Sequence, residues 1–218
     1  VQRHATLAIP LRPRNFRATE AACRWLLANT AAETYQLFSG FEGEKHAGPG
    51  LLGGGKGKKV TAGARLGAAL VRSYLHTTPQ ALAELWRQTA LGHFQGGMTG
   101  YNAHYANSLT ALFIACGQDV ANVVNSALGV TSLEVTPEGD LWASVTLPSL
   151  TVATVGGGTA QGTARECLEM LGCAGGGKAV KLAEIAAATV LAGELSMGAA
   201  LASGEFVAAH ETYGRNRP

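Results

Sequence analysis

A single carboxylate, that of Asp119, is the first side chain in this sequence with a setting suited to acid–base chemistry. It is the only acidic residue between Glu84 and Glu134, and it ends the mostly apolar stretch ALFIACGQD at residues 111–119. An isolated carboxylate on such a helix either faces water at the helix edge or is buried, and a buried carboxyl group is a usual arrangement for acid–base catalysis. Periodicity alone leaves both readings open.

Two glycine-rich patterns within residues 48–57 approach nucleotide-binding motifs. Residues 48–53 match G-x-G-x-x-G, but no strand precedes them and Pro49 blocks the tight turn that the motif needs. Residues 50–56 approach the phosphate loop G-x-x-x-x-G-K, yet Gly57 stands where a serine or threonine hydroxyl should hold magnesium. Both patterns are therefore interpreted as a mobile basic lid, and no cofactor and no metal are predicted.

The elements that must position these residues follow an α+β order, with helices in runs and strands in runs. Residues 1–38 are predicted to hold a strand and a helix, residues 39–59 a glycine-rich linker or lid, and residues 60–218 the core. Thr78 and Pro79 are typical of a helix start. The expected strands are 6–11, 60–70, 133–135, 141–147 and 151–155, and the expected helices are 16–38, 77–91, 102–127, 159–171, 178–202 and 205–213.

Composition narrows the class of protein. With 218 residues, of which 47% are hydrophobic, the chain can bury a full core, and a net charge of +2 argues against a nucleic-acid partner. The four cysteines form no CxxC pair, which favours a reduced, cytoplasmic protein. Glu184 and Glu194 interrupt the most apolar stretch, residues 182–202, so a buried helix and no membrane partner are predicted. The chain starts at Val1, which leaves open whether residues precede it.

Four further segments stand out: GYNAHYAN at residues 100–107, FIACGQD at 113–119, TVGGGT at 154–159 and CLEMLG at 167–172. The first two resemble one signature of the hydroxymethylglutaryl-CoA (HMG-CoA) reductase family, and the other two resemble a second. The resemblance runs in register from about Lys56 to Asn216. It implies the large catalytic domain of that family, with a long central helix, flanking helices and a small antiparallel sheet.

The resemblance also implies roles for the residues that match the family's motifs. Asp119 corresponds to the catalytic aspartate, His210 to the histidine that protonates the departing CoA thiolate, and Asn107 to an asparagine that orders the catalytic polar network. His104 is interpreted as a structural core histidine. The family's substrate-binding lysine falls near Arg87 or Gln88, and the second signature places Gly156, Gly157, Gly158 and Thr159 at the substrate.

The chain departs from the family's pattern at the residues and the insertion that the family uses for reduction. The family's catalytic glutamate, and the lysine of an Asp-Lys-Lys motif expected just before Gly55, find no counterpart. The nicotinamide-binding insertion would fall between Tyr35 and Gly55, where only the glycine-rich linker lies, and a βαβ unit needs about thirty residues. The insertion is therefore predicted to be absent.

These matches and departures predict a repurposed scaffold without redox chemistry. The favoured function is a cofactor-independent cyclase, isomerase or lyase acting on a small hydrophobic organic substrate in a specialised biosynthetic pathway. One alternative is a non-catalytic binding or scaffold relative, and a second is a component of a genuine NAD(P)H-dependent HMG-CoA reductase. The family's dimeric active site and the apolar helical faces of this sequence imply a homodimer.

Overall fold

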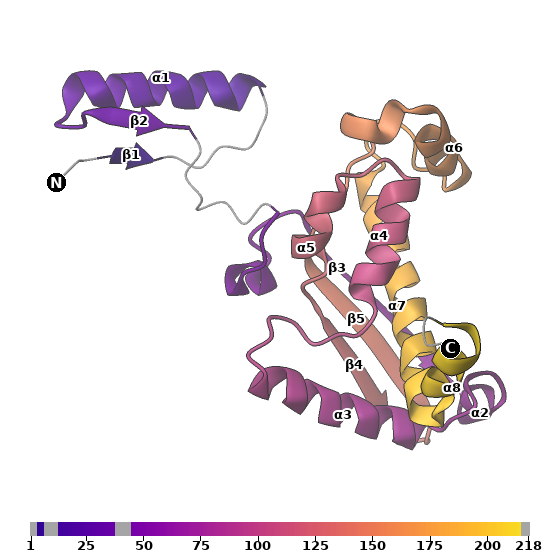
Figure 1. Cartoon of the computed structure of the whole chain (residues 1–218). Coiled ribbons are helices and arrows are strands. Elements are labelled where there is room, and N and C mark those ends of the chain that lie inside the picture. The colour runs from indigo at the N-terminus through magenta and orange to yellow at the C-terminus, as the bar shows by residue number, and fades with distance from the viewer. Residues whose placement is uncertain (1–3, 7–12, 38–44, 215–218) are drawn as a thin grey trace. The chain divides into compact units, whose positions relative to one another are not determined.

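The computed structural model describes residues 4–6, 13–37 and 45–214, and the chain divides into two compact units (Figure 1). The first unit comprises residues 1–44 and the second comprises residues 45–218. The boundary falls inside the segment that the sequence predicts to be a linker, and the role of that segment as a lid stays a prediction.

The first unit contains a strand–helix–strand arrangement. Strand β1 (His4–Thr6) pairs in parallel with β2 (Thr34–Gln36), and helix α1 (Pro13–Asn29) lies between them in the chain. Parallel strands need a crossover of this kind, because a short turn would reverse the direction of the chain.

An antiparallel three-stranded sheet forms one layer of the second unit. Its strands are β3 (Lys58–Leu66), β4 (Val130–Val135) and β5 (Leu141–Leu150), in the order β3-β5-β4. Alternate residues of β5 are fully buried on one face, namely Leu141, Ala143, Val145 and Leu147. Trp142, on the opposite face, is 42% exposed. The sheet thus has one face on the core and one toward water, which is usual for an antiparallel sheet.

Helix α7 (Ala179–Ser203) is the central element of the core. It packs against β3, β5, α3 (Pro79–Gln95) and α4 (Tyr105–Ala115), as Figure 1 shows. Of the helices in the described part of the chain, it alone has the length and apolar composition of a membrane span. Nine of its residues are nevertheless buried within the unit. The prediction of a buried helix over residues 182–202 is therefore confirmed.

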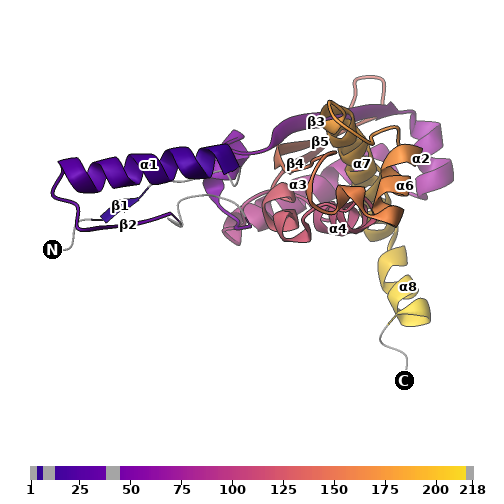
Figure 2. The same ribbon diagram turned by 90° about the horizontal axis from the view of Figure 1, so that it is seen from above.

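Shorter helices complete the second unit. They are α2 (Ala68–Leu75), α5 (Val123–Ser126), α6 (Gly162–Met170) and α8 (Glu205–Tyr213), with 3-10 helices at Pro49–Gly53, Val120–Asn122 and Gly157–Ala160. Figure 2 shows α8 projecting from the body of this unit. In the described residues, one long central helix, shorter helices around it and a three-stranded antiparallel sheet confirm the α+β class.

Two elements of the chain end earlier than the sequence predicts. Helix α1 stops at Asn29, and β2 replaces the last part of the helix predicted for residues 16–38. Strand β3 stops before Ala68, because the backbone N–H of Ala68 donates to Asp140 Oδ1 (3.0 Å) and α2 starts there. Residues 7–11 of the first predicted strand lie outside the described residues.

The prediction of one long helix over residues 102–127 is wrong. Helix α4 ends at Ala115, and Gly117, with a φ of +61°, turns the chain out of the helix. Asp119 therefore follows the helix instead of lying on it, and it precedes the 3-10 helix Val120–Asn122.

Side-chain hydrogen bonds explain the outcome of two other local predictions, one wrong and one confirmed. The strand predicted for residues 151–155 is wrong, because β5 ends before it and the N–H of Ala153 donates to Gln118 Oε1 (2.8 Å) instead of to a neighbouring strand. The predicted start of α3 is confirmed, because Thr78 Oγ1 accepts from the N–H of Ala81 (3.1 Å) as a helix cap.

Candidate active site

Asp119 forms an ion pair with Lys45. The Lys45 Nζ lies 3.0 Å from Asp119 Oδ2, and the two side chains are 46% and 50% exposed. Of the two readings of Asp119, the water-facing one is confirmed and the buried one is wrong. Asp119 Oδ1 accepts from the N–H of Ala121 (3.2 Å), which fixes the carboxylate at the start of the 3-10 helix that follows.

Asn122 binds the same carboxylate from a buried position. Its Nδ2 donates to Asp119 Oδ2 at 3.3 Å, and the residue is 4% exposed. The carboxylate therefore binds an ammonium group, a side-chain amide N–H and a backbone N–H. This arrangement holds both charged groups in place before any substrate arrives, which is the condition for electrostatic catalysis.

Lys45 is a residue that the sequence patterns did not single out. The expectation was that this chain has no counterpart of the lysine in the Asp-Lys-Lys motif, yet the structure places a lysine on Asp119. A signal for it exists in Glu44-Lys45-His46, where an acidic residue, a lysine and a second basic residue follow one another before Gly55. Two exchanges, glutamate for aspartate and histidine for lysine, separate this triplet from the motif.

The glycine-rich loop at residues 156–159 packs on the segment that carries Asp119. A Cβ atom on Gly117 would lie 2.4 Å from Gly158 O, so the two backbones are in direct contact. Thr159 closes the loop, because its hydroxyl donates to Gly156 O (2.7 Å). The structure therefore brings the predicted residues Gly156, Gly157, Gly158 and Thr159 next to the Asp119 segment, and substrate binding by this loop stays a prediction.

Replacing Gly117 with alanine should lower the free energy of unfolding by about 2–4 kcal/mol, because the added methyl group meets Gly158 O and alanine disfavours a positive φ. Urea unfolding measures the loss. The matched control is Gly139→Ala, where φ is +85° and a Cβ atom would meet nothing within 4 Å. Equal losses in the two variants would show that the contact between the loops contributes no stability.

Asn107 and His210 are not joined to Asp119 by any hydrogen bond or ion pair that the structure shows among residues 45–214. Asn107 lies on α4 with its side chain exposed. His210 is exposed on α8, where its Nδ1 bonds to Phe206 O of the same helix (2.8 Å). Their catalytic roles stay predictions from the resemblance.

Arg87 and Gln88 both bind Glu84 on the exposed side of α3. Arg87 Nη2 lies 2.6 Å and Gln88 Nε2 lies 2.7 Å from Glu84 Oε1. The hydrogen bond from Arg87, followed by that from Gln88, lowers the pKa of Glu84 to about 2. In the described part of the chain, the contacts of these two side chains are therefore to their own helix, and substrate binding by either one stays a prediction.

Arg87→Ala should raise the pKa of Glu84 toward its ordinary value, since the largest cause of its depression is removed. A lowered pKa in the folded state means that the pair stabilises the fold above the carboxyl's ordinary pKa, and that this stabilisation is lost as the pH falls toward about 2. NMR titration of the Glu84 carboxyl measures the change. Arg165→Ala, which breaks the similar Arg165–Glu169 pair on α6, serves as the control and should leave Glu84 unaffected. An unchanged Glu84 titration in Arg87→Ala contradicts the assignment.

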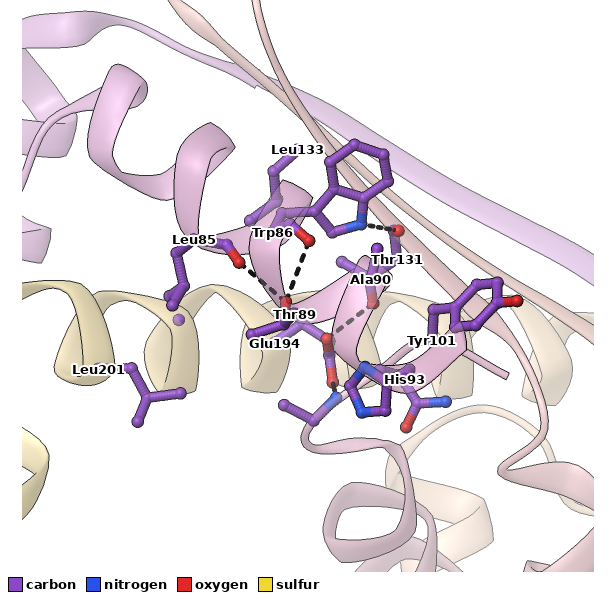
Figure 3. Close-up of a pocket in the computed structure, with 13 residues that line it drawn as sticks. Leu85, Trp86, Thr89, Ala90, His93, Tyr101, Thr131, Leu133, Glu194 and Leu201 are labelled. Atoms are coloured by element: carbon purple, nitrogen blue, oxygen red, sulfur yellow. Dashed lines mark hydrogen bonds between the residues drawn. The ribbon is translucent and has the colours of Figure 1, made fainter. Parts of the chain in front are cut away.

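A cavity of about 70 Å³ lies between α3, β4 and α7 (Figure 3). Its lining is mostly apolar and includes Trp86, Leu133 and Leu201, with the Glu194 carboxylate on its polar side. Pockets that bind organic ligands measure about 300–1,000 Å³, so this cavity is too small for a substrate by itself. The ion pair of Lys45 and Asp119 is therefore the better candidate for the reaction site.

Glu194 is a buried carboxylate with a structural role. Its Oε1 accepts from the backbone N–H groups of Ala103 (2.9 Å) and His104, and its Oε2 accepts from Thr131 Oγ1 (2.7 Å). Burial raises the pKa of the neighbouring Tyr105 phenol, and the charge of Glu194 adds to that rise. The network ties α7 to β4 and to the segment that begins α4.

Comparison with known proteins gives consistent matches. Residues 16–215 match the family model described as hydroxymethylglutaryl-coenzyme A reductase. The chain is 49% identical over 173 residues to the 3-hydroxy-3-methylglutaryl-coenzyme A reductase of Methanocaldococcus jannaschii, covering 79% of this chain and 42% of the relative. The corresponding protein of Methanothermobacter thermautotrophicus is 43% identical over 199 residues, covering 91% of this chain and 50% of the relative. The chain thus spans about half the length of these curated relatives.

These matches overturn the predicted function. A cofactor-independent cyclase, isomerase or lyase is wrong, because relatives that are 41–50% identical over 74–91% of the chain are named as reductases. The chain departs less from the family's pattern than the sequence motifs indicated. The family match begins at residue 16, within α1, and not near Lys56. Lys45, which the sequence patterns did not select, pairs with Asp119.

Proposed function

The chain belongs to the hydroxymethylglutaryl-CoA reductase family, and on this basis we propose that it forms part of a nicotinamide-dependent reductase and contributes the groups that bind the reacting thioester carbonyl. The observation that carries the proposal is the 3.0 Å ion pair between Lys45 and Asp119 beside the glycine-rich loop. Because the chain spans 42% and 50% of two relatives, the activity of the whole enzyme is part of the proposal.

The ion pair fits the electrostatic demand of this reduction. Addition of hydride to a thioester carbonyl converts the carbonyl oxygen to an oxyanion, which a positioned ammonium group stabilises. Lys45 is half exposed and so can reach a substrate. Asp119, which accepts a hydrogen bond from Asn122, fixes the position of the ammonium group through the ion pair. Lys45 therefore serves as the oxyanion-binding group in this proposal, and Asp119 orients it.

His210 serves in this proposal as the general acid for the departing thiolate. An imidazole can donate a proton to a leaving group near neutral pH. His210 is exposed on α8, which supports access to a substrate, but it makes its own bond to Phe206 O and not to Asp119. A homodimer, in which a second copy contributes groups to the site, stays a proposal, as do Asn107 in the polar network and a cytoplasmic location.

The described residues do not form a complete nicotinamide site. Residues 48–53, which match the glycine pattern of a phosphate-binding turn, lie largely in the 3-10 helix Pro49–Gly53, with no strand directly before it. The strand–helix–strand of the first unit has strands of only three residues. No catalytic step is therefore assigned to residues of this chain through the cofactor. The absence of a nicotinamide-binding insertion between Tyr35 and Gly55 stays a prediction.

A segment exchange tests the proposed function. The 173 matched residues of this chain replace the corresponding segment of the Methanocaldococcus jannaschii reductase, and NADPH oxidation is followed with and without HMG-CoA. The expected result is HMG-CoA-dependent oxidation that is lost in the same chimera carrying Asp119→Asn. A folded chimera that oxidises no NADPH in the presence of HMG-CoA would contradict the proposal.

A further inference from the structure

We infer that Asn125 is a positioning residue that holds Lys45 against Asp119. Asn125 is fully buried, and its Oδ1 accepts a hydrogen bond from the backbone N–H of Lys45 (3.2 Å). Its Nδ2 donates to Thr151 Oγ1 (3.1 Å), which fixes the orientation of the amide. The catalytic meaning of this contact rests on the proposed function, whereas the contact itself does not.

The backbone of Lys45 needs such an anchor. Its φ is +61°, in the left-handed region that residues with a side chain seldom adopt. A conformation of this kind persists only when surrounding contacts enforce it, and such residues cluster at functional sites. The hydrogen bond from Lys45 N–H to Asn125 is a contact that enforces it here.

One short helical segment controls both members of the ion pair. Asn122 and Asn125 are three residues apart, so they lie on the same side of a helical turn. Asn122 binds the carboxylate of Asp119, and Asn125 binds the backbone of Lys45. Loss of Asn125 should therefore release the lysine while leaving the aspartate held.

The segment after Lys45 has an anchor of its own on the sheet, in addition to the 3.5 Å contact of Asn125 Nδ2 with Ser149 O. Ser149 Oγ donates to Leu51 O (2.6 Å), and both residues are buried. A change at Asn125 should therefore alter the conformation at Lys45 without detaching residues 49–53 from the sheet.

Zero-length carbodiimide cross-linking, followed by peptide mass spectrometry, tests the inference on the purified 218-residue chain without substrate. The reagent joins a carboxylate to an amine only when the two are in contact, so the yield of the Lys45–Asp119 cross-link reports the ion pair. Asn125→Leu, which has a similar size and no acceptor, should lower that yield by about five- to ten-fold. Asn125→Asp keeps an acceptor oxygen and should retain most of the yield.

Asn102→Leu is the matched control. The Asn102 amide also ties a loop to the core, through Ala127 O (3.1 Å) and Gly129 O (3.2 Å), so its loss reports general loosening. Its cross-link yield should equal that of the unmodified chain. Circular dichroism checks folding, and Asn125→Ser, whose hydroxyl is too short to reach Lys45, replaces Asn125→Leu if the latter unfolds. A yield that is unchanged without the Asn125 acceptor, or that falls equally in Asn102→Leu, would overturn the inference.

The reductase chimera supplies the second readout. Asn125→Leu should lower kcat while leaving the KM for HMG-CoA within about two-fold. A displaced ammonium group stabilises the transition state less well but changes the binding of the ground-state substrate little. A normal kcat combined with a lost cross-link would overturn the catalytic meaning of the contact. An inactive parent chimera would instead contradict the proposed function and leave the cross-linking result to decide the position of Lys45.

Discussion

Lys45→Ala is expected to lower the kcat of the reductase chimera by about 10²–10³-fold, the usual effect of removing one group that stabilises an oxyanion. The ammonium group lies 3.0 Å from Asp119 Oδ2, and the Lys45 side chain is 46% exposed. The substitution therefore removes a charge that is accessible to the substrate carbonyl, and it leaves the buried core intact. Steady-state kinetics with HMG-CoA and NADPH measure the loss. The melting temperature should change little, because an exposed ion pair contributes little to stability.

Lys178→Ala is the control for this prediction. Lys178 is exposed at the start of α7, so the variant has the same change in net charge at a lysine for which the described residues show no ion pair with Asp119. Its kcat should stay within about two-fold of the parent. Equal losses in both variants would show that Lys45 acts through the overall charge and not through its position.

Glu194→Leu is expected to lower the free energy of unfolding by about 3–5 kcal/mol, which corresponds to a drop of about 10 °C in the melting temperature. The leucine offers no acceptor, so the N–H groups of Ala103 and His104 lose this buried carboxylate partner. The hydroxyl of Thr131 keeps only its longer contact with the Tyr105 hydroxyl (3.4 Å). Thermal and urea unfolding of the purified chain measure the effect.

Two variants of the same helix separate charge from hydrogen bonding. Glu194→Gln keeps one acceptor oxygen and should lose less stability than Glu194→Leu. Glu184→Leu removes an exposed carboxylate from α7 and should change the free energy of unfolding by no more than about 0.5 kcal/mol. If Glu194→Leu is as stable as Glu184→Leu, the buried network does not support the fold.

Local sequence signals predicted the parts of the fold that depend on local chemistry. The apolar run of residues 182–202, interrupted by Glu184 and Glu194, predicted a buried helix, and α7 confirms it. Thr78 and Pro79 predicted the start of α3 by capping, and the cap is present. The helix predicted for residues 102–127 failed because one glycine turn at Gly117 is decided by backbone contact with Gly158, which lies far along the chain.

In the candidate site, too, the residue within a local motif could be predicted, and the residue placed by distant contacts was not. Asp119 could be selected from the sequence because it is a lone carboxylate within a recognisable motif. Lys45 was not selected because Glu44-Lys45-His46 differs from the Asp-Lys-Lys motif at two positions. Its contact with Asp119 also depends on a buried amide at Asn125 and on a left-handed backbone, which the sequence pattern does not show. The functional prediction failed because it inferred a loss of redox chemistry from an apparently absent nicotinamide-binding insertion and two unmatched catalytic motifs, whereas relatives over most of the chain are named as reductases.

Isotope transfer from the cofactor tests the central claim most directly. The reductase chimera is incubated with HMG-CoA and NADPH carrying deuterium at the transferable hydride, and the product is examined by mass spectrometry. Reduction of a thioester to a primary alcohol takes up two hydrides, so the account predicts an alcohol that carries two deuterium atoms, formed by the parent and nearly abolished in Lys45→Ala. A product without deuterium, or equal labelled product from Lys45→Ala, would contradict it.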